Sequence, residues 1–366
     1  MIITCTRCVM NSTVPGIFFD ENGCCNYCIE HEEKVKLIPA NKKDAEKRLK
    51  NLIDKIKSKK RGQYDCIIGL SGGVDSSYVA YIVTKLGLNP LAVHFDNGWN
   101  SELSIKNIEN IVRNLKIDLV TYVIDWNEFR DIQKSFFKAN VVDIEMITDH
   151  AIFAAMYKIA NKNKIKYIIS GTNAATESIM PDEWQHFKFD LLNLKSIHKK
   201  YGSLKIKNYP TVSIWNIAWQ KYVKGIETVS ILNYLKYNKN EAMNILSETI
   251  GWSYYGGKHY ESSFTKFYQS YILPEKFNID KRLIHLSDLI MNNEVDRSQA
   301  LLELQKKPYD EIQIEADIEY VIKKLGMTKS EFSNYMSTKP KSHYDFPSYA
   351  KIAKKLVNIY KKNRYN

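Results

Sequence analysis

Residues 64–77 read Tyr-Asp-Cys-Ile-Ile-Gly-Leu-Ser-Gly-Gly-Val-Asp-Ser-Ser. The first half of this stretch is apolar, as in a buried strand, and the second half is small and polar and leads into a helix that reaches about Leu86. Glycines let the backbone approach a phosphate closely, and N–H groups at a helix start attract anions. The Gly-Lys-Ser/Thr ending of a Walker A loop is missing. The sequence therefore predicts another kind of phosphate-binding loop, in which Asp75 is placed to hold Mg²⁺.

Further strand and helix patterns extend outward from this loop. We expect strands at residues 90–96, 118–124, 167–171 and 228–234, separated by helices of which the clearest are at 101–115, 126–138 and 145–161. Strands that alternate with helices indicate a parallel sheet covered on both faces. The predicted fold class is α/β, a Rossmann-like open parallel sheet, and residues beyond 239 are expected to be helical.

Five of the six cysteines fall within the first 28 residues, and four of them form two pairs, Cys5-x2-Cys8 and Cys25-x2-Cys28; the fifth is Cys24. Two such pairs can close a tetrahedral Zn²⁺ site, and four thiolates leave no open position for catalysis, so the predicted role is structural. Disulfides are the alternative, but the chain begins without a secretory pattern, and reducing compartments disfavour them. An iron–sulfur cluster is a second alternative, for which this spacing is less typical.

The composition is that of a globular protein, with 44% hydrophobic and 26% charged residues. No apolar stretch approaches the roughly 20 residues that cross a bilayer. We therefore expect a cytoplasmic protein without a membrane partner. Residues 34–61 carry twelve Lys or Arg against three Asp or Glu, and residues 337–366 carry eight against one. Such segments either attract nucleic acid or small anions, or are solvated faces of helices.

The loop resembles that of the PP-loop ATP pyrophosphatases, the adenine-nucleotide alpha-hydrolase type, whose signature is SGGxDS. These enzymes cleave ATP between the α and β phosphates. The resemblance implies that pyrophosphate lies on Ser71, Gly72, Gly73, Val74, Asp75, Ser76 and Ser77. It also implies that the end of the second strand, with His94, Phe95 and Asp96, contacts adenosine. Gly171, Thr172 and Asn173 follow the fourth strand at the same edge of the sheet, and Glu177 is expected to be a second Mg²⁺ ligand.

Longer motifs resemble those of the N-acetyl sugar amidotransferases. These motifs lie at residues 5–10, 71–77, 93–99, 170–177, 255–262, 271–277 and 279–287. One departure is Lys266, where arginine is expected, and a lysine makes a weaker phosphate contact because it cannot bind in bidentate fashion.

The resemblance implies a reaction, its catalytic residues and its partners. AMP is transferred to the oxygen of an N-acetyl group on a bacterial surface-sugar precursor, ammonia attacks, and an acetamidino sugar, AMP and pyrophosphate result. The residues expected at the reacting groups are Asp75, Glu177, Lys258, His259, Lys281 and Arg282. The insert after Glu177 is expected to form a sugar-binding wall with Asp182, Asp190, Asn193 and His198. Because no stretch is typical of a glutaminase, ammonia is expected from a separate glutaminase subunit.

Two other functions fit parts of the sequence. A tRNA-modifying PP-loop enzyme of the thiolation or lysidine type also often carries a zinc knob, but Cys66 is the only cysteine after residue 28, which disfavours sulfur chemistry. A non-enzymatic zinc-knob interaction protein is disfavoured by the intact loop. The expected organisation is a four-cysteine zinc-binding knob at 1–33, a basic connecting helix at 34–61, the PP-loop domain at 62–250 and a helical region at 251–366 that completes the active site.

Overall fold

The computed structural model describes residues 2–36, 38, 41–257 and 260–352. Its centre is a parallel sheet of five strands in the order β3-β2-β1-β4-β5. The strands are β1 (Cys66–Gly69), β2 (Pro90–Asp96), β3 (Asp118–Val123), β4 (Tyr167–Ser170) and β5 (Glu227–Ser230). β1 is paired with β2 on one side and with β4 on the other. The strands β2 and β3 therefore extend the sheet in one direction from β1, and β4 and β5 extend it in the opposite direction. Ligands of open α/β folds bind at such a switch point, beyond the carboxyl ends of the strands.

Helices cover both faces of the sheet, as the alternating pattern predicts. On one face α3, α4 and α9 pack together over β1 and β2, and on the other α6 lies against β1, β2 and β4. The helices of this half are α2 (Lys42–Ser58), α3 (Val74–Lys85), α4 (Glu102–Leu115), α5 (Trp126–Ala139), α6 (Met146–Lys162), α7 (Leu191–Tyr201), α8 (Ile214–Tyr222) and α9 (Lys239–Ile250). Both faces of β1 are buried, which explains why its sequence is apolar throughout rather than alternating.

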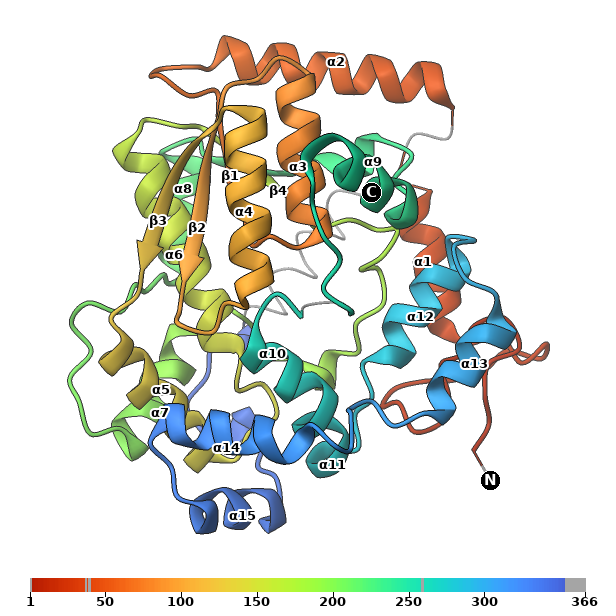
Figure 1. Cartoon of the computed structure of the whole chain (residues 1–366), viewed down its shortest axis with the longest axis vertical. Helices are drawn as coiled ribbons and strands as arrows, with labels where there is room; N and C mark the ends of the chain where they lie inside the picture. The colour runs from red at the N-terminus through yellow and green to blue at the C-terminus, as the bar shows by residue number, and fades with distance from the viewer. Residues whose placement is uncertain (1, 37, 39–40, 258–259, 353–366) are drawn as a thin grey trace.

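A helical region follows, below the sheet in Figure 1. It comprises α10 (Ser263–Phe267), the π-helical turn η3 (Tyr268–Ile272), α11 (Leu273–Phe277), α12 (Arg282–Met291), α13 (Arg297–Gln305), α14 (Ile314–Leu325) and α15 (Lys329–Ser337). The π-helical turn stands directly before Pro274, which has no N–H to donate to the preceding turn. One hydrophobic core joins these helices to α5, α6 and the N-terminal cysteines, so the helical region packs against both the sheet half and the knob.

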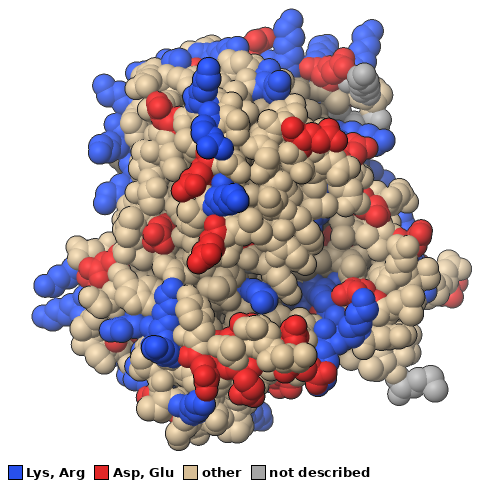
Figure 2. Space-filling model, in the orientation of Figure 1, with Lys and Arg blue, Asp and Glu red and all other residues tan. Residues whose placement is uncertain are grey.

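The N-terminal segment ends in α1 (Asn26–Val35), which packs beside α12 (Figure 1). Of the basic connecting helix predicted at 34–61, Lys42–Ser58 form α2, whereas Lys34 and Val35 belong to α1. The apolar residues Leu49, Leu52, Ile53 and Ile56 of α2 are buried against the sheet half. Figure 2 shows cations along the top of the molecule, over α2, and the acidic residues gathered over α14 below. Over the helices that the structure describes, none is long and apolar enough to span a bilayer.

The strand predicted at 228–234 is shorter than expected. β5 ends at Ser230, and the remaining residues form a 3-10 turn, η2 (Ile231–Tyr234). Ile231 and Leu232 are buried in this turn against α2 and the helices on that face. Because both residues are apolar, the sequence pattern is the same as that of a longer buried strand. The basic residues beyond 352 lie outside the part of the chain that the structure describes.

Candidate functional site

The loop Ser71–Ser77 connects β1 to α3 at the switch point of the sheet. Gly72 has φ +81°, and a Cβ atom there would lie 2.4 Å from the carbonyl oxygen of Ser104 on α4. No side chain fits that space, and residues other than glycine adopt that conformation only with strain. A bare backbone is therefore required where the loop crosses α4, and this brings the amide groups of residues 71–76 to the edge of the sheet.

The loop is shaped by its own hydroxyls and by a tyrosine from far along the chain. Ser71 Oγ lies 3.1 Å from Ser76 Oγ and accepts a hydrogen bond from the Gly73 amide at 3.2 Å. The Val74 amide, at the start of α3, donates to Tyr255 Oη at 3.1 Å. Burial raises the pKa of Tyr255, so its hydroxyl keeps its proton. The segment after α9 therefore packs directly against the loop.

A first cavity, of about 220 Å³, opens over the loop, and we call it the loop cavity. Its lining residues are Ser71, Gly73, Val74, Asp75, Ser76, Ser170, Gly171, Thr172, Thr176, Glu177, Lys239, Tyr255, Glu261, His285 and Leu289. The end of β4 comes close to the loop here, since a Cβ atom on Gly171 would lie 3.3 Å from the Ser76 amide nitrogen. The cavity thus combines amide and hydroxyl donors with the carboxylates of Glu261, Asp75 and Glu177, of which the last two are the predicted Mg²⁺ ligands.

These two carboxylates fit the chemistry of Mg²⁺, which prefers one or two protein carboxylates together with phosphate oxygens. Asp75 is further oriented by the Tyr237 hydroxyl, which donates to its Oδ1 atom. Burial, followed by the charge of Asp75, raises the pKa of Tyr237, so the tyrosine remains a donor. Asp75 and Glu177, predicted from different parts of the sequence, therefore line the same cavity.

A second cavity, of about 450 Å³, lies beside the first, and we call it the charged cavity. Ser71, Ser76 and Glu261 line both cavities, so the loop is their common wall. His94 and Phe95 from β2 lie on one side of the charged cavity. Its charged residues besides Glu261 are Asp143, Glu145, Asp149, Lys188 and Lys281. The two cavities together can hold an extended anionic molecule with its phosphates at the loop.

The charged groups of this cavity perturb one another. Lys188 Nζ lies 2.7 Å from Asp143 and 3.1 Å from Asp149; burial opposes its charge, but these carboxylates raise its pKa. Burial, with a smaller effect of Lys188, lowers the pKa of Lys281. Burial raises the pKa of Glu145 to about 7, and the charge of Asp149 adds to this, although the Thr265 hydroxyl donates to Glu145 Oε1 at 2.5 Å. A carboxyl that titrates near neutral pH beside a phosphate-binding loop is a candidate proton acceptor.

The two predicted catalytic cations that the structure describes, Lys281 and Arg282, have different surroundings. Lys281 lines the charged cavity, as expected of a residue that neutralises phosphate. Arg282, its neighbour, is placed elsewhere: its guanidinium binds Asp280 at 2.7 Å and the Glu303 carbonyl at 3.0 Å. The expectation for Arg282 is therefore corrected, because its charge is already paired on the outer side of α12. Lys258 and His259 lie outside the described residues.

Some of the residues predicted to bind nucleotide line the two cavities, and others do not. Of the loop residues, Gly72 and Ser77 line neither cavity; Gly72 serves the turn, and Ser77 is fully buried in α3. Asp96 accepts hydrogen bonds from the Gly98 amide and from Asn100, so it orders the turn after β2 instead of lining the cavity. Asn173 accepts from the Thr176 amide and lines a neighbouring groove, which shares Thr172 and Glu177 with the loop cavity.

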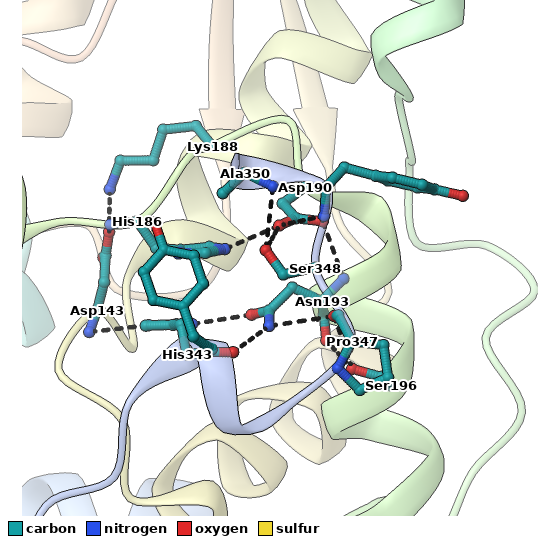
Figure 3. Close-up of polar contacts among 12 residues, drawn as sticks. Asp143, His186, Lys188, Asp190, Asn193, Ser196, His343, Pro347, Ser348 and Ala350 are labelled. Carbon is teal, nitrogen blue, oxygen red and sulfur yellow. Dashed lines mark hydrogen bonds and ion pairs between the residues drawn. The ribbon is translucent and has the colours of Figure 1, made fainter. Parts of the chain in front are cut away.

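Three of the four residues predicted for the sugar-binding wall, Asp190, Asn193 and His198, make structural contacts instead, and the fourth, Asp182, is exposed at the start of the 3-10 turn η1 (Asp182–Trp184). Asp190 accepts from His186, Ser348 and the Tyr349 amide, and Asn193 exchanges hydrogen bonds with His343 (Figure 3). Both Asp190 and Asn193 are fully buried, and their polar atoms bind residues 343–349. His198 pairs with Asp131 in the same way, at 2.8 Å. The insert reaches the charged cavity through other residues, namely Gln185 and Lys188.

Cys66 is fully buried in β1, and burial raises the pKa of its thiol. It lines neither cavity, so it is not placed for sulfur transfer. Of the tryptophans, Trp184 and Trp252 are packed in the core, whereas Trp215 and Trp219 on α8 are largely exposed.

The four N-terminal cysteines form a compact buried group. Their Sγ atoms all lie within 4.8 Å of one another, and three of the separations are 3.7–3.8 Å. Zn–S bonds of about 2.3 Å in a tetrahedron place sulfur atoms about 3.8 Å apart, so the group fits Zn²⁺. The amides of Arg7, Met10 and Cys25 also point at these sulfurs, which favours thiolates. The four cysteines predicted as ligands are thus brought together.

Comparison with known proteins supports this description of the chain. Residues 45–202 match the family model "NAD synthase", and residues 261–361 match "LPS biosynthesis protein WbpG-like, C-terminal domain". The α/β domain is thus similar to PP-loop domains of the NAD synthase type, and residues 261–361 are similar to the C-terminal domain of the WbpG-like LPS biosynthesis family. No match was found among the curated proteins.

Solved structures with similar folds include two synthetases and a tRNA-related protein. NH3-dependent NAD synthetase from Campylobacter jejuni subsp. jejuni is 17% identical, with 73% of this chain and 97% of that chain covered and a TM-score of 0.32. NMN synthetase from Francisella tularensis is 20% identical (37% and 57% covered, TM-score 0.31), so the chain spans less than two thirds of that relative. A predicted subunit of tRNA methyltransferase from Methanocaldococcus jannaschii is 17% identical (50% and 74% covered, TM-score 0.30).

Proposed function

We propose that this protein is an ATP-dependent amidotransferase that converts the N-acetyl group of a bacterial surface-sugar precursor into an acetamidino group. The two family matches support an ATP-using enzyme of lipopolysaccharide biosynthesis. The sequence motifs, which resemble those of N-acetyl sugar amidotransferases, indicate the substrate class. The candidates are a nonulosonic acid of the pseudaminic or legionaminic type and a nucleotide-linked diacetamido sugar. Either sugar would be used in lipopolysaccharide or flagellin glycans. We place the reaction in the cytoplasm.

The observation that carries the proposal is the junction of the two cavities. Ser71, Ser76 and Glu261 line both, so a nucleotide whose phosphates lie on the loop would place its α-phosphate at the entrance of the charged cavity. An acetyl oxygen entering from the charged cavity could then attack that phosphorus atom. Catalysis by such a site depends on positioning and on neutralisation of the phosphate charge.

The reaction has two balanced steps. The acetamide oxygen attacks the α-phosphorus, the α–β bond of ATP breaks, and pyrophosphate leaves with that electron pair. Ammonia then adds to the carbon of the imidate, the C–O bond breaks, and AMP leaves with the former acetyl oxygen. One proton must be removed from the attacking nitrogen, and Glu145 is the carboxyl that we assign to it. Lys281 is assigned to the charge that develops on the α-phosphate, together with Lys258, which the motif resemblance implies.

Mg²⁺ would be held by Asp75 and Glu177 in the loop cavity, where it supplies charge neutralisation on the phosphate oxygens. The amides of Gly73 and Val74 and the hydroxyls of Ser71 and Ser76 would hold the pyrophosphate. Ammonia would come from a separate glutaminase subunit, so the purified chain should use ammonium but not glutamine.

The test supplies purified protein with Mg–ATP, ¹⁵N-ammonium and candidate N-acetyl sugars. The proposal predicts AMP and pyrophosphate in equal amounts and a sugar in which ¹⁵NH has replaced the acetyl oxygen, read by mass spectrometry. Asp75→Asn should abolish all three products. Formation of AMP only when tRNA is added would contradict the sugar substrate and favour the tRNA-modifying class. Turnover of glutamine by the chain alone would contradict the separate glutaminase.

A further inference from the structure

The cysteine knob is hydrogen-bonded to α12, which borders the loop cavity, and to α13, which follows it. Arg297, the first residue of α13, donates to the carbonyl oxygens of Cys5 at 2.6 Å and Cys8 at 2.9 Å. The Val9 amide donates to Ser287 Oγ on α12 at 3.3 Å. The backbone of two predicted metal ligands therefore contacts α13 directly, and the residue after Cys8 contacts α12.

A buried bridge of three side chains extends this attachment toward the cavity. His31, on α1 one turn after Cys28, has its Nδ1 atom 2.5 Å from Ser178 Oγ, and Ser178 Oγ donates to Asp288 Oδ1 on α12 at 2.5 Å. Since a serine hydroxyl has one proton and gives it to Asp288, His31 Nδ1–H must be the donor to Ser178. All three side chains are less than 5% exposed, so the bridge is shielded from water.

Two of the three bridge residues, Ser178 and Asp288, stand next to residues of the loop cavity. Ser178 directly follows Glu177, and Asp288 lies one helical turn after His285, which also lines the cavity. Asp288 Oδ2 accepts from the Ile179 amide at 3.4 Å, and Lys34 on α1 donates to the Ser178 carbonyl. Residues 171–181 form no helix or strand. The position of Glu177 therefore depends on contacts of this kind and not on a regular element.

We infer that Ser178 is a positioning residue that ties Glu177 to the cysteine knob, so that metal in the knob sets the geometry of the Mg–ATP site. This inference rests on the proposed function for the identity of the ligand in the loop cavity. In this inference the knob influences catalysis through the position of Glu177, and its metal does not contact the reacting groups. Zn²⁺ held by the four cysteines would fix Cys28 and the start of α1, which carries His31, and His31 and Asp288 together hold Ser178.

The experiment measures Mg–ATP affinity by titration calorimetry, with the zinc content of each sample determined beside it. We compare wild type, Ser178→Ala, His31→Ala and the double variant, because one single change removes the central residue of the bridge and the other removes its end on the side of the knob. Each single variant should retain zinc and bind Mg–ATP roughly 10-fold more weakly, the loss typical of removing a partner behind a metal ligand. The double variant should be no weaker than either single one, since one bridge is broken in all three. Ser12→Ala, which loses only a local hydrogen bond to the Ile3 amide, is the matched control and should bind as wild type does.

A structural role alone would lower the unfolding temperature and leave the Mg–ATP affinity unchanged, and this result in zinc-loaded Ser178→Ala would overturn the inference. Additive losses in the double variant would overturn it as well. Should Ser178→Ala not fold, His31→Ala makes the same test from the knob side. A wild-type protein that does not bind Mg–ATP would overturn the proposed function together with the inference, whereas unchanged affinity in the variants overturns the inference alone.

Discussion

At the residue scale, Gly72 is the clearest link between sequence and site. Its positive φ and the 2.4 Å approach that a Cβ atom would make to the Ser104 carbonyl both require glycine. We expect Gly72→Ala to lower the free energy of unfolding by about 1–3 kcal/mol, because the loop or α4 must shift. Gly69→Ala is the control for stability, since nothing lies within 4 Å of its added methyl group, and it should change this free energy by less than about 0.5 kcal/mol. Urea unfolding of both variants measures the difference, and equal values would contradict the account of the loop.

Glu145 gives a prediction about pH. Its pKa is raised to about 7, and a base acts in its deprotonated form, so the rate at fixed free ammonia should rise as the pH passes through about 7 and then level off. Glu145→Gln should remove this rise and lower kcat by roughly 10²- to 10⁴-fold. Glu109→Gln, on the exposed face of α4, is the matched control and should keep the wild-type profile. An unchanged pH profile in Glu145→Gln would exclude this carboxyl as the proton acceptor.

Individual site residues could be predicted only where a motif names them. Asp75, Gly171 and Glu177 belong to short motifs at strand ends, and strand ends in a parallel sheet meet at one edge. Glu145, Thr265 and Lys188 come from three separate helices or loops, and no local pattern brings them together. The prediction for Arg282 is wrong because its partner Asp280 lies two residues before it, and only the fold shows which way the guanidinium turns.

At the scale of elements, the sequence predicts the sheet well, because buried parallel strands are continuous apolar runs between helices with a regular period. β2 has the predicted bounds, and α5 and α6 begin and end within one residue of theirs. The insert that carries Asp190 and Asn193 shows where this reasoning fails. Polar residues in a loop-rich segment resemble a ligand site. Here, however, these residues form hydrogen bonds with residues 343–349, about 150 positions away in the sequence.

This network supports a prediction on the C-terminal segment. Asn193 donates to the His343 carbonyl at 2.8 Å and accepts from His343 Nδ1 at 2.8 Å; burial and the adjacent His186 ring lower the pKa of His343 to about 3, which keeps it neutral. Asn193→Ala should cost about 1–3 kcal/mol of unfolding free energy, because buried partners lose their hydrogen bonds. Hydrogen exchange of residues 342–350 should rise with it.

Lys195→Ala is the matched control on the same helix, since the Lys195 side chain is exposed to solvent. It should leave the exchange of residues 342–350 close to that of wild type. If Asn193→Ala exchanged no faster than this control, the network would not hold the segment in place.

At the scale of the whole molecule, the site lies where the α/β half, the helical region and the loop after β4 meet. The family match to NAD synthase ends at residue 202 and the WbpG-like match begins at Glu261, a residue that lines both cavities. The α/β half contributes the loop Ser71–Ser77, and the helical half contributes Lys281 and Thr265 to the charged cavity. On this account the PP-loop half supplies ATP chemistry and the second half selects what is activated.

The central claim is that ATP activates the acetyl oxygen by adenylylation, and oxygen transfer tests it most directly. The N-acetyl sugar is labelled with ¹⁸O in its acetyl group and converted with ATP and ammonium. The account predicts that the ¹⁸O appears in AMP, because that oxygen leaves the carbon bound to the α-phosphorus. Recovery of the ¹⁸O in inorganic phosphate with formation of ADP, or its retention in the sugar, would contradict the account.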